Sequence, residues 1–295
     1  MNRNEWTLAR EVAVKAAVKA GELAKLRFGG QLNLQHKDEQ GDLVTEVDVQ
    51  ADRLIVDEIL SVFPTHRIYS EEAGEGGAAS DWVWHVDPLD GTNNFAIGIP
   101  LYGVSISLSY QGRIVLGVVH DSAQEITYVA VQGEGAWQGN IKLQAKPYGA
   151  LAKSTISWIQ GHRVGKFNEQ ALGLRHHLEY TVKRVLRIWA PTITWAMLAR
   201  GDLHGIVLYD SEGEDLYAGL LLAQEAGVKV TDFAGNPVAL LGGTVVQTEV
   251  SADQAEAGTS QAKGRTQQAA YLVAAVPEYH AELLAYVQQG LKKTE

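Results

Sequence analysis

Residues 85–95 read HVDPLDGTNNF, and this stretch places two aspartates three residues apart at the end of an apolar run. Pro88 fixes the backbone angle φ near −65°, so that both carboxylates and the Leu89 carbonyl can turn toward one point. Carboxylates about 4 Å apart repel each other by about 4 kcal/mol at an effective dielectric constant near 20. A cation bound between Asp87 and Asp90 would offset this repulsion, and magnesium prefers such hard oxygen ligands.

The residues that follow predict a site for an anion. Gly91 and Thr92 would open a helical turn whose free N–H groups face a phosphate. The same residues also suit an ordinary turn in which Asp90 caps a helix, and the dipeptides alone do not separate the two interpretations. The rest of the chain must decide between them.

Three other acidic residues have structural explanations of their own. Glu71 follows a strand-like run and suits an exposed loop. Thr45 and Asp48 have the spacing of a capping box at the start of a helix. Asp215 falls in a predicted first helical turn, where the helix dipole favours negative charge. Each acid alone therefore indicates little about function.

The composition is that of an acidic globular protein. Among 295 residues the formal net charge is −10, and there is no basic stripe of the kind that binds nucleic acid. No apolar run approaches the ~18 residues of a transmembrane helix, and the first residues lack the apolar block of a signal peptide. We therefore expect a cytoplasmic protein without nucleic-acid or membrane partners. The absence of cysteine excludes disulfides and cysteine-ligated metal sites.

Hydrophobic periodicity predicts helices followed by a sheet in the first part of the chain. Apolar residues recur every three to four positions over 4–28 and 46–62, which is typical of amphipathic helices. From residue 82 onward, short β-rich runs are separated by turn residues. We expect a mostly antiparallel sheet with helices on one side.

Strands and helices alternate in the later part of the chain, with one helix predicted over 165–178. The polar residues 251–268 predict an irregular surface loop. We therefore expect an N-terminal α+β half, 1–147, that carries most of the candidate acids. The C-terminal α/β half, 148–295, would carry Asp215 and much of a substrate pocket.

Four stretches together resemble the inositol monophosphatase family. DPLDGTNNF at 87–95 resembles its first signature, and EDLYAGLLLAQEAG at 214–227 resembles its second. DLVTEVD at 42–48 and SEE at 70–72 occur in the family's order and spacing, so that the resemblance covers residues 5–230. It implies an α+β / α/β fold, the layered αβαβα sandwich of the sugar-phosphatase type. It also implies magnesium-dependent hydrolysis of a small-molecule phosphate monoester, commonly by a lithium-sensitive homodimer.

The resemblance also assigns roles by position. Asp48 would accept a hydrogen bond from Thr92 and orient its hydroxyl toward the attacking water, with Glu71 as a further catalytic residue. Gly91 and Thr92 would hold phosphate oxygens, and Lys37 would screen the phosphate. Asp90 and Asp215 would contact the substrate as well as metal. The ligands implied for two or three Mg²⁺ ions are Glu71, Asp87, the Leu89 carbonyl, Asp90 and Asp215.

The chain departs from the family's pattern on the leaving-group side. Trp189 and Pro191 stand in a stretch where the family usually has Gly-Ser/Thr-Ala. Leu208 replaces an acid that contacts inositol hydroxyls, and Glu214 stands in place of a tryptophan. A bulky indole and an apolar leucine cannot hydrogen-bond a polyol as that acid does, so the identity of the alcohol stays open.

Three functions remain compatible with the sequence. The leading hypothesis is a Mg²⁺-dependent phosphomonoesterase acting on inositol monophosphate or a related sugar phosphate. The alternative within the same class is a 3′-phosphoadenosine 5′-phosphate or fructose 1,6-bisphosphate phosphatase. A non-catalytic metal or phosphate-binding protein is the hypothesis from another class, because fold alone does not establish function. The pairing of Asp48 with Thr92 argues against it, since binding alone does not require that pair.

Overall fold

The computed structural model describes most of the chain. Residues described are 3–36, 43–211, 215–241, 244–246, 259–262, 265–268 and 270–293. The helices are α1 (Arg3–Arg27), α2 (Glu46–Val62), α3 (Thr92–Ala96), α4 (Glu169–Thr181), α5 (Pro191–Arg200), α6 (Asp215–Glu225) and α7 (Pro277–Lys292), with a 3₁₀ turn at Leu151–Lys153.

The first sheet is 10-stranded and mostly antiparallel, as the sequence predicted. Its main path runs in the order β10-β9-β8-β7-β6-β5-β3-β4, and among the described pairs only β3 and β5 run parallel. β15 pairs with both β16 and β7. The strands are β3 (Arg67–Ser70), β4 (Gly74–Gly77), β5 (Trp82–Asp90), β6 (Gly103–Tyr110), β7 (Arg113–Asp121), β8 (Ile126–Val131), β9 (Gly135–Gln138), β10 (Ile141–Lys142), β15 (Ala239–Leu241) and β16 (Thr244–Val246).

The second sheet is five-stranded, in the order β12-β11-β13-β19-β14. The first three strands in this row run parallel, and β19 is antiparallel to both of its neighbours. The carboxyl ends of β12, β11 and β13 therefore meet at one edge. The strands are β11 (Thr155–Gln160), β12 (Arg184–Leu186), β13 (Gly205–Ser211), β14 (Lys229–Asp232) and β19 (Ala270–Ala275).

Two short hairpins lie outside these sheets. β1 (Gln35–His36) pairs with β2 (Leu43–Val44), and β17 (Thr259–Ala262) pairs with β18 (Arg265–Gln268). The prediction of an irregular loop over 251–268 is therefore wrong for the residues of β17 and β18, because polar residues can pair through their backbones without a hydrophobic pattern. The rest of that stretch lies outside the described residues.

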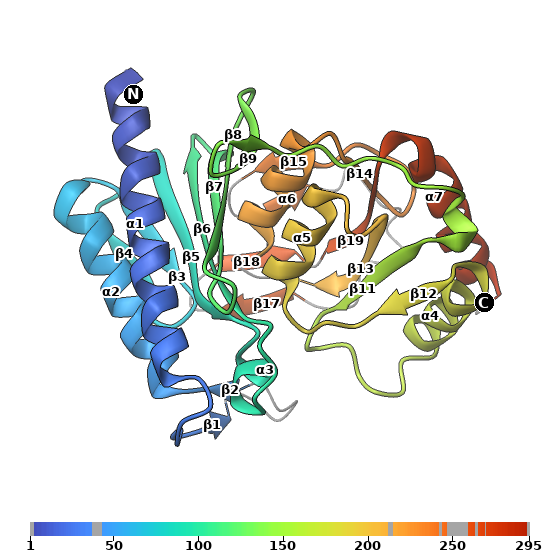
Figure 1. Ribbon diagram of the computed structural model, residues 1–295, viewed down its shortest axis with the longest axis horizontal. Helices are drawn as coiled ribbons and strands as arrows, with labels where there is room; N and C mark the ends of the chain where they lie inside the picture. The colour runs from blue at the N-terminus through green and yellow to red at the C-terminus, as the bar shows by residue number, and fades with distance from the viewer. Residues whose placement is uncertain are drawn as a thin grey trace.

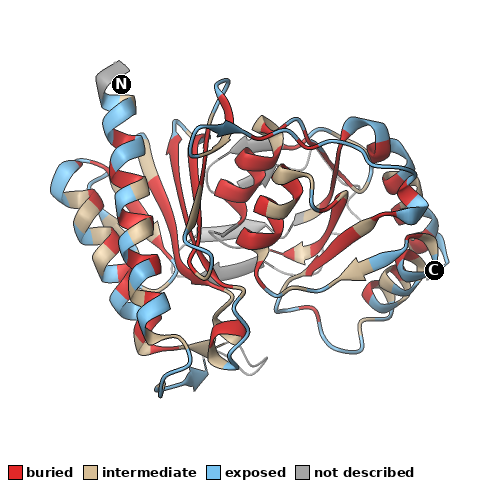
Figure 2. Ribbon diagram, viewed as in Figure 1, coloured by how far each residue is buried: buried red, intermediate tan, exposed pale blue. Residues whose placement is uncertain are grey.

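Helices and sheets alternate in layers, which run from left to right in Figure 1. α1 and α2 pack on one face of the first sheet, α6 packs on its other face beside α5, and α7 covers the second sheet together with α4. The αβαβα sandwich is confirmed, whereas the expectation of helices on only one side of the first sheet is wrong. Strands β6 and β7 are buried along nearly their whole length because both faces are covered, as Figure 2 shows.

Two further features bear on the sequence predictions. No helix in the described ranges combines the length and apolar character needed to span a bilayer. The division into halves at residue 147 stays a prediction. Most of the first sheet precedes that residue, whereas β15 and β16 follow it.

Candidate active site

The two aspartates of the quoted stretch lie at the end of β5, where its pairing with β6 becomes irregular. The register shifts between Asp87 and Asp90, and this bulge contains Pro88, which has no N–H for the ladder. Oδ1 of Asp87 accepts a 3.0 Å hydrogen bond from the N–H of Leu89. Both carboxyl residues are buried, with 4% and 6% of their surface exposed. The bulge thus brings two buried carboxylates to one end of the strand.

Thr92 links this bulge to Asp48. Its hydroxyl lies 2.9 Å from Oδ1 of Asp48 and 2.8 Å from the carbonyl oxygen of Leu89. A hydroxyl has one proton, so these two acceptors share it. The structure therefore brings Asp48 together with Leu89 and Thr92, although Asp48 and Thr92 lie 44 positions apart in the sequence.

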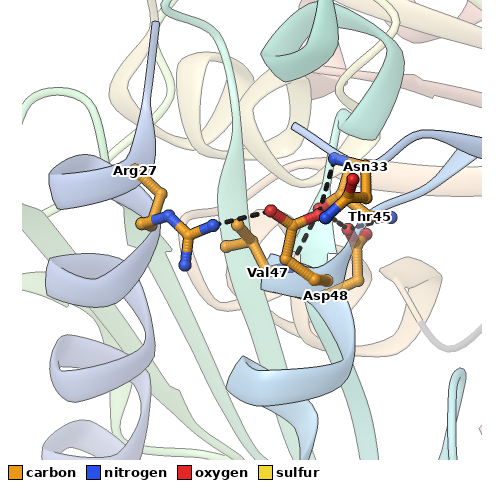
Figure 3. Close-up of polar contacts among 6 residues, drawn as sticks. Arg27, Asn33, Thr45, Val47 and Asp48 are labelled. Atoms are coloured by element: carbon orange, nitrogen blue, oxygen red, sulfur yellow. Dashed lines mark hydrogen bonds and ion pairs between the residues drawn. The ribbon is translucent and has the colours of Figure 1, made fainter. Parts of the chain in front are cut away.

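Asp48 is held in place by the start of α2. Its Oδ2 accepts hydrogen bonds from the N–H of Thr45 at 2.8 Å and from the Thr45 hydroxyl at 2.6 Å, and the Thr45 hydroxyl accepts one from the N–H of Val47. The predicted capping box is confirmed, and the contacts are drawn in Figure 3. Asp48 is therefore both a helix-capping residue and, through Oδ1, a partner of Thr92.

Glu46, the first residue of α2, ties this turn to the end of α1. Arg27 donates a 2.6 Å hydrogen bond to its carboxylate, and the backbone N–H of Asn33 donates another at 2.8 Å (Figure 3). These contacts fix the direction in which α2 begins. They therefore help to hold Asp48 opposite the bulge of β5.

Asp90 lies against the start of α5. Its Oδ2 accepts a 2.7 Å hydrogen bond from the N–H of Thr192, in the first turn of that helix. Burial is the main cause that raises the pKa of the Asp90 carboxyl to about 7; the negative charge of Glu71 contributes to this rise, and the hydrogen bond from Thr192 opposes it. Glu71 follows β3, which runs parallel to β5, and its N–H donates to Val86 on that strand. The ends of β3 and β5 thus bring these two acids into electrostatic contact.

Gly91 forms the sharp turn between the bulge and α3. Its φ of +84° is left-handed, and a Cβ there would lie 2.8 Å from the carbonyl oxygen of Leu101. Such close backbone contact together with positive φ requires glycine. The turn directs Thr92 back toward Asp48.

Asn94, which sequence reasoning did not single out, joins this turn to a distant loop. Its side-chain nitrogen donates to the carbonyl oxygens of Leu101, Ile188 and Trp189 at 3.0, 2.7 and 3.4 Å. Asn94 is 5% exposed. The signal was present as the second asparagine of GTNNF, but nothing in the sequence indicated its partners.

The structure describes only some of the other residues that the sequence analysis singled out. Lys37 and Glu214 lie outside the described residues, and Asp215 begins α6 with its side chain outside them. Leu208 is 1% exposed in the core on β13, whereas Trp189 is 45% exposed. Within the described part, no three histidine or acidic side chains form a group suited to a metal ion. The roles of the assigned ligands therefore remain proposals.

Comparison with known proteins identifies the family. The sequence profile of the inositol monophosphatase family matches residues 5–281. The fructose-1,6-bisphosphatase/inositol-1-monophosphatase of Thermotoga maritima is 33% identical over 229 residues, which are 76% of this chain and 85% of that protein. The inositol-1-monophosphatase of Mesorhizobium japonicum is 35% identical over 246 residues, 80% of this chain and 89% of that one.

A solved structure agrees with these sequence matches. The IMPase structure from Thermotoga maritima superposes with a TM-score of 0.78 and 25% identity, over 100% of both chains. Enzymes of the matched family depend on metal ions and act on small phosphate monoesters. The chain belongs to the inositol monophosphatase family, and it is a phosphatase of phosphate monoesters.

Proposed function

We propose that the protein is a magnesium-dependent phosphatase that hydrolyses inositol monophosphate or a related sugar phosphate. The observation that carries this proposal is the 2.9 Å hydrogen bond between the Thr92 hydroxyl and the buried Asp48. A site that only bound phosphate would need donors facing the phosphate oxygens, but no carboxylate behind one of those donors. The pair therefore supports hydrolysis over simple binding.

The oxygen donors near the end of β5 suit magnesium. Carboxylates and a backbone carbonyl are the hard ligands that this ion prefers, with room left for substrate oxygens. Asp90 experiences the negative charge of Glu71, and a bound cation would reverse that repulsion. Ions bound there would supply Lewis acidity, which lowers the pKa of water and stabilises a leaving oxygen. The proposed ligands of two or three Mg²⁺ ions are Glu71, Asp87, the Leu89 carbonyl, Asp90 and Asp215.

The proposed role of Thr92 and Asp48 is to position the attacking water and take its proton. When the Leu89 carbonyl is engaged as a ligand, the single proton of the Thr92 hydroxyl points to Asp48 alone. The Thr92 oxygen can then accept a hydrogen bond from the water. As the water oxygen attacks phosphorus in line, its proton passes by way of Thr92 to Asp48 and the bond from phosphorus to the alcohol oxygen breaks. The leaving oxygen takes its proton from solvent.

The remaining assignments concern the substrate and its surroundings. The backbone N–H groups of Gly91 and Thr92 are proposed to hold phosphate oxygens, while Lys37 screens their charge and Asp90 and Asp215 contact the substrate. The alternative substrates are 3′-phosphoadenosine 5′-phosphate and fructose 1,6-bisphosphate. The Thermotoga relative is named as a fructose-1,6-bisphosphatase as well as an inositol-1-monophosphatase, which supports the second alternative. Cytoplasmic location and assembly as a homodimer stay predictions that rest on composition and on the family resemblance.

The test is phosphate release from a panel of inositol, sugar and nucleotide phosphates, with magnesium and with EDTA. T92A and T92S are compared with the wild type. We expect release only with magnesium, a loss of about 100-fold or more in kcat for T92A, and retention of most activity in T92S. T92S keeps the hydroxyl and T92A does not, so the pair distinguishes the effect of the hydroxyl on activity from the effect of side-chain shape.

Two results would contradict the proposal. Equal kcat in T92A and the wild type would show that the Thr92 hydroxyl has no role in the reaction. No turnover of any substrate, together with retained binding of inorganic phosphate, would favour the non-catalytic hypothesis.

A further inference from the structure

The loop that precedes α5 is fastened to the same turn that carries Thr92. The carbonyl oxygens of Ile188 and Trp189 accept hydrogen bonds from Asn94 of α3 at 2.7 and 3.4 Å. A Cβ added at Gly91 would lie 3.2 Å from the side chain of Ala190. The residue next to Trp189 therefore contacts the turn at which phosphate is proposed to bind.

Trp189 has an unusual conformation for a large residue. Its φ is +58°, which bulky side chains rarely adopt, and its side chain is not buried in compensation, since 45% of the residue is exposed. Such a conformation persists only where the surroundings impose it. Here the bonds from Asn94 on one side and the bond from Thr192 to Asp90 on the other fix the loop. Hydrophobic burial does not account for this indole.

Cationic and aromatic groups surround the indole. The guanidinium carbon of Arg187 lies 5.4 Å from the centre of the Trp189 ring, and the ring of His162 lies 5.8 Å away at an interplanar angle of 58°. Contact with a guanidinium is favourable for an indole face and orders the ring. Since 45% of Trp189 stays exposed, Arg187 and His162 leave part of its surface open to a ligand.

The position of this group in the fold is one where ligands bind. His162 follows β11, and Trp189 follows β12; these neighbouring parallel strands end at the same edge of the second sheet (Figure 1). Ligands of open α/β sheets bind outside the carboxyl ends of such strands. The alcohol of a substrate held at Gly91 and Thr92 would extend toward this edge.

We propose that Trp189, supported by Arg187, recognises the leaving group by stacking, and that it favours monoesters whose alcohol carries a flat ring, such as nucleoside monophosphates, over small polyol phosphates. This inference rests on the proposed function for the phosphate half of the site. An indole supplies a flat surface but no hydrogen-bond acceptor, so it discriminates by ring area and not by hydroxyl pattern. Arg187 adds a positive charge that suits an anionic substrate.

The test compares adenosine 5′-monophosphate, which has a ring to stack, with glycerol 2-phosphate, which has none. W189A is expected to raise KM for the nucleotide by about tenfold or more, as loss of base stacking does. Its kcat should stay within about twofold, and KM for glycerol 2-phosphate should not change. W189F should recover most of the nucleotide affinity. A higher wild-type kcat/KM for the nucleotide than for myo-inositol 1-phosphate is also expected.

W137A is the matched control. Trp137 on β9 is also partly exposed and also has a cation over its ring, Lys142 at 5.7 Å, but it lies on a different strand near the far edge of the first sheet. The proposal is overturned if W189A affects both substrates equally, if W137A has the same effect, or if the wild type prefers myo-inositol 1-phosphate.

Calorimetric titration with adenosine 5′-monophosphate separates this inference from the proposed function. If the wild type hydrolyses none of the inositol, sugar and nucleotide phosphates, the proposed function fails. Binding that is about tenfold weaker in W189A would then still support recognition by Trp189. Equal binding by wild type and W189A would overturn it.

Discussion

The backbone N–H of Thr192 donates a 2.7 Å hydrogen bond to Oδ2 of Asp90, and this bond spans 102 positions of the sequence. Ala190, the N-cap of α5, makes no side-chain capping bond. Asp90, at the end of β5, instead accepts the hydrogen bond of a free N–H group in the first turn of the helix. The negative charge also suits the helix dipole. Asp90 therefore has a structural role as well as its proposed role as a ligand.

These two roles of Asp90 can be separated with D90N. The amide oxygen can still accept the bond from Thr192, so we expect the free energy of unfolding to fall by less than about 1 kcal/mol. Phosphate release should fall by about 100-fold or more, because the charge that a cation needs is gone. Urea denaturation and initial rates measure the two effects. Activity within threefold of the wild type would exclude Asp90 as a ligand.

Thr45 is expected to act on catalysis through Asp48. T45A removes both the helix cap and one of the two bonds to Oδ2, so stability should fall by about 1 kcal/mol. Because Asp48 then loses a constraint opposite Thr92, kcat should fall while KM changes little. T45S should restore both quantities. If T45A lowers stability but leaves kcat unchanged, Thr45 serves the helix alone.

Gly21 marks a close approach between α1 and β7. A Cβ there would lie 2.3 Å from Cδ2 of His120, so G21A should destabilise the protein by about 1–3 kcal/mol. The direction of the change in stability is informative, because replacing a glycine inside a helix with alanine usually stabilises a protein. Thermal unfolding measures the change. The control is G165A, where an added Cβ meets nothing within 4 Å and stability should stay within about 0.5 kcal/mol.

His120 should make stability depend on pH. Burial lowers its pKa in the folded protein from 6.5 to about 4, although Glu125 opposes the shift. The unfolded chain therefore binds a proton that the folded one does not between those values. The contribution of His120 to the free energy of unfolding should be fully present above pH 6.5. It should fall by up to about 3 kcal/mol as the pH decreases toward 4.

The matched variant for this pH dependence is H120N. Urea denaturation of the wild type and of H120N between pH 4.5 and 7.5 gives the contribution of His120 as the difference between the two slopes. The carboxylates titrate in both proteins and cancel in that difference. Equal slopes would contradict the assignment.

Sequence reasoning succeeded where interactions are local. The limits of α2 were predicted as 46–62 and are Glu46–Val62, because the capping box of Thr45 and Asp48 acts within four residues. The helix predicted at 165–178 begins instead at Glu169. Asn168 accepts a 2.8 Å hydrogen bond from the N–H of Ala171, a capping signal that the prediction overlooked.

The parts of the site that escaped prediction depend on distant contacts. Asn94 meets Ile188 across 94 positions, and nothing near either residue indicates the other. The continuation of β5 through Pro88 depends on β6 to pair with the bulge. The family resemblance supplied the layered fold and the assignments of the acids, whereas periodicity alone placed helices on only one side of the first sheet.

The position of β19 affects the order in which the protein can fold during synthesis. β19 lies between β13 and β14, although it follows both in the chain and ends at Ala275. Strands β3 to β10 can pair while the ribosome is still making the later residues. The second sheet cannot close until β19 has emerged, and β13 and β14 meanwhile expose unpaired edges to which chaperones can bind. The second sheet therefore has all five of its strands only after Ala275 has been translated.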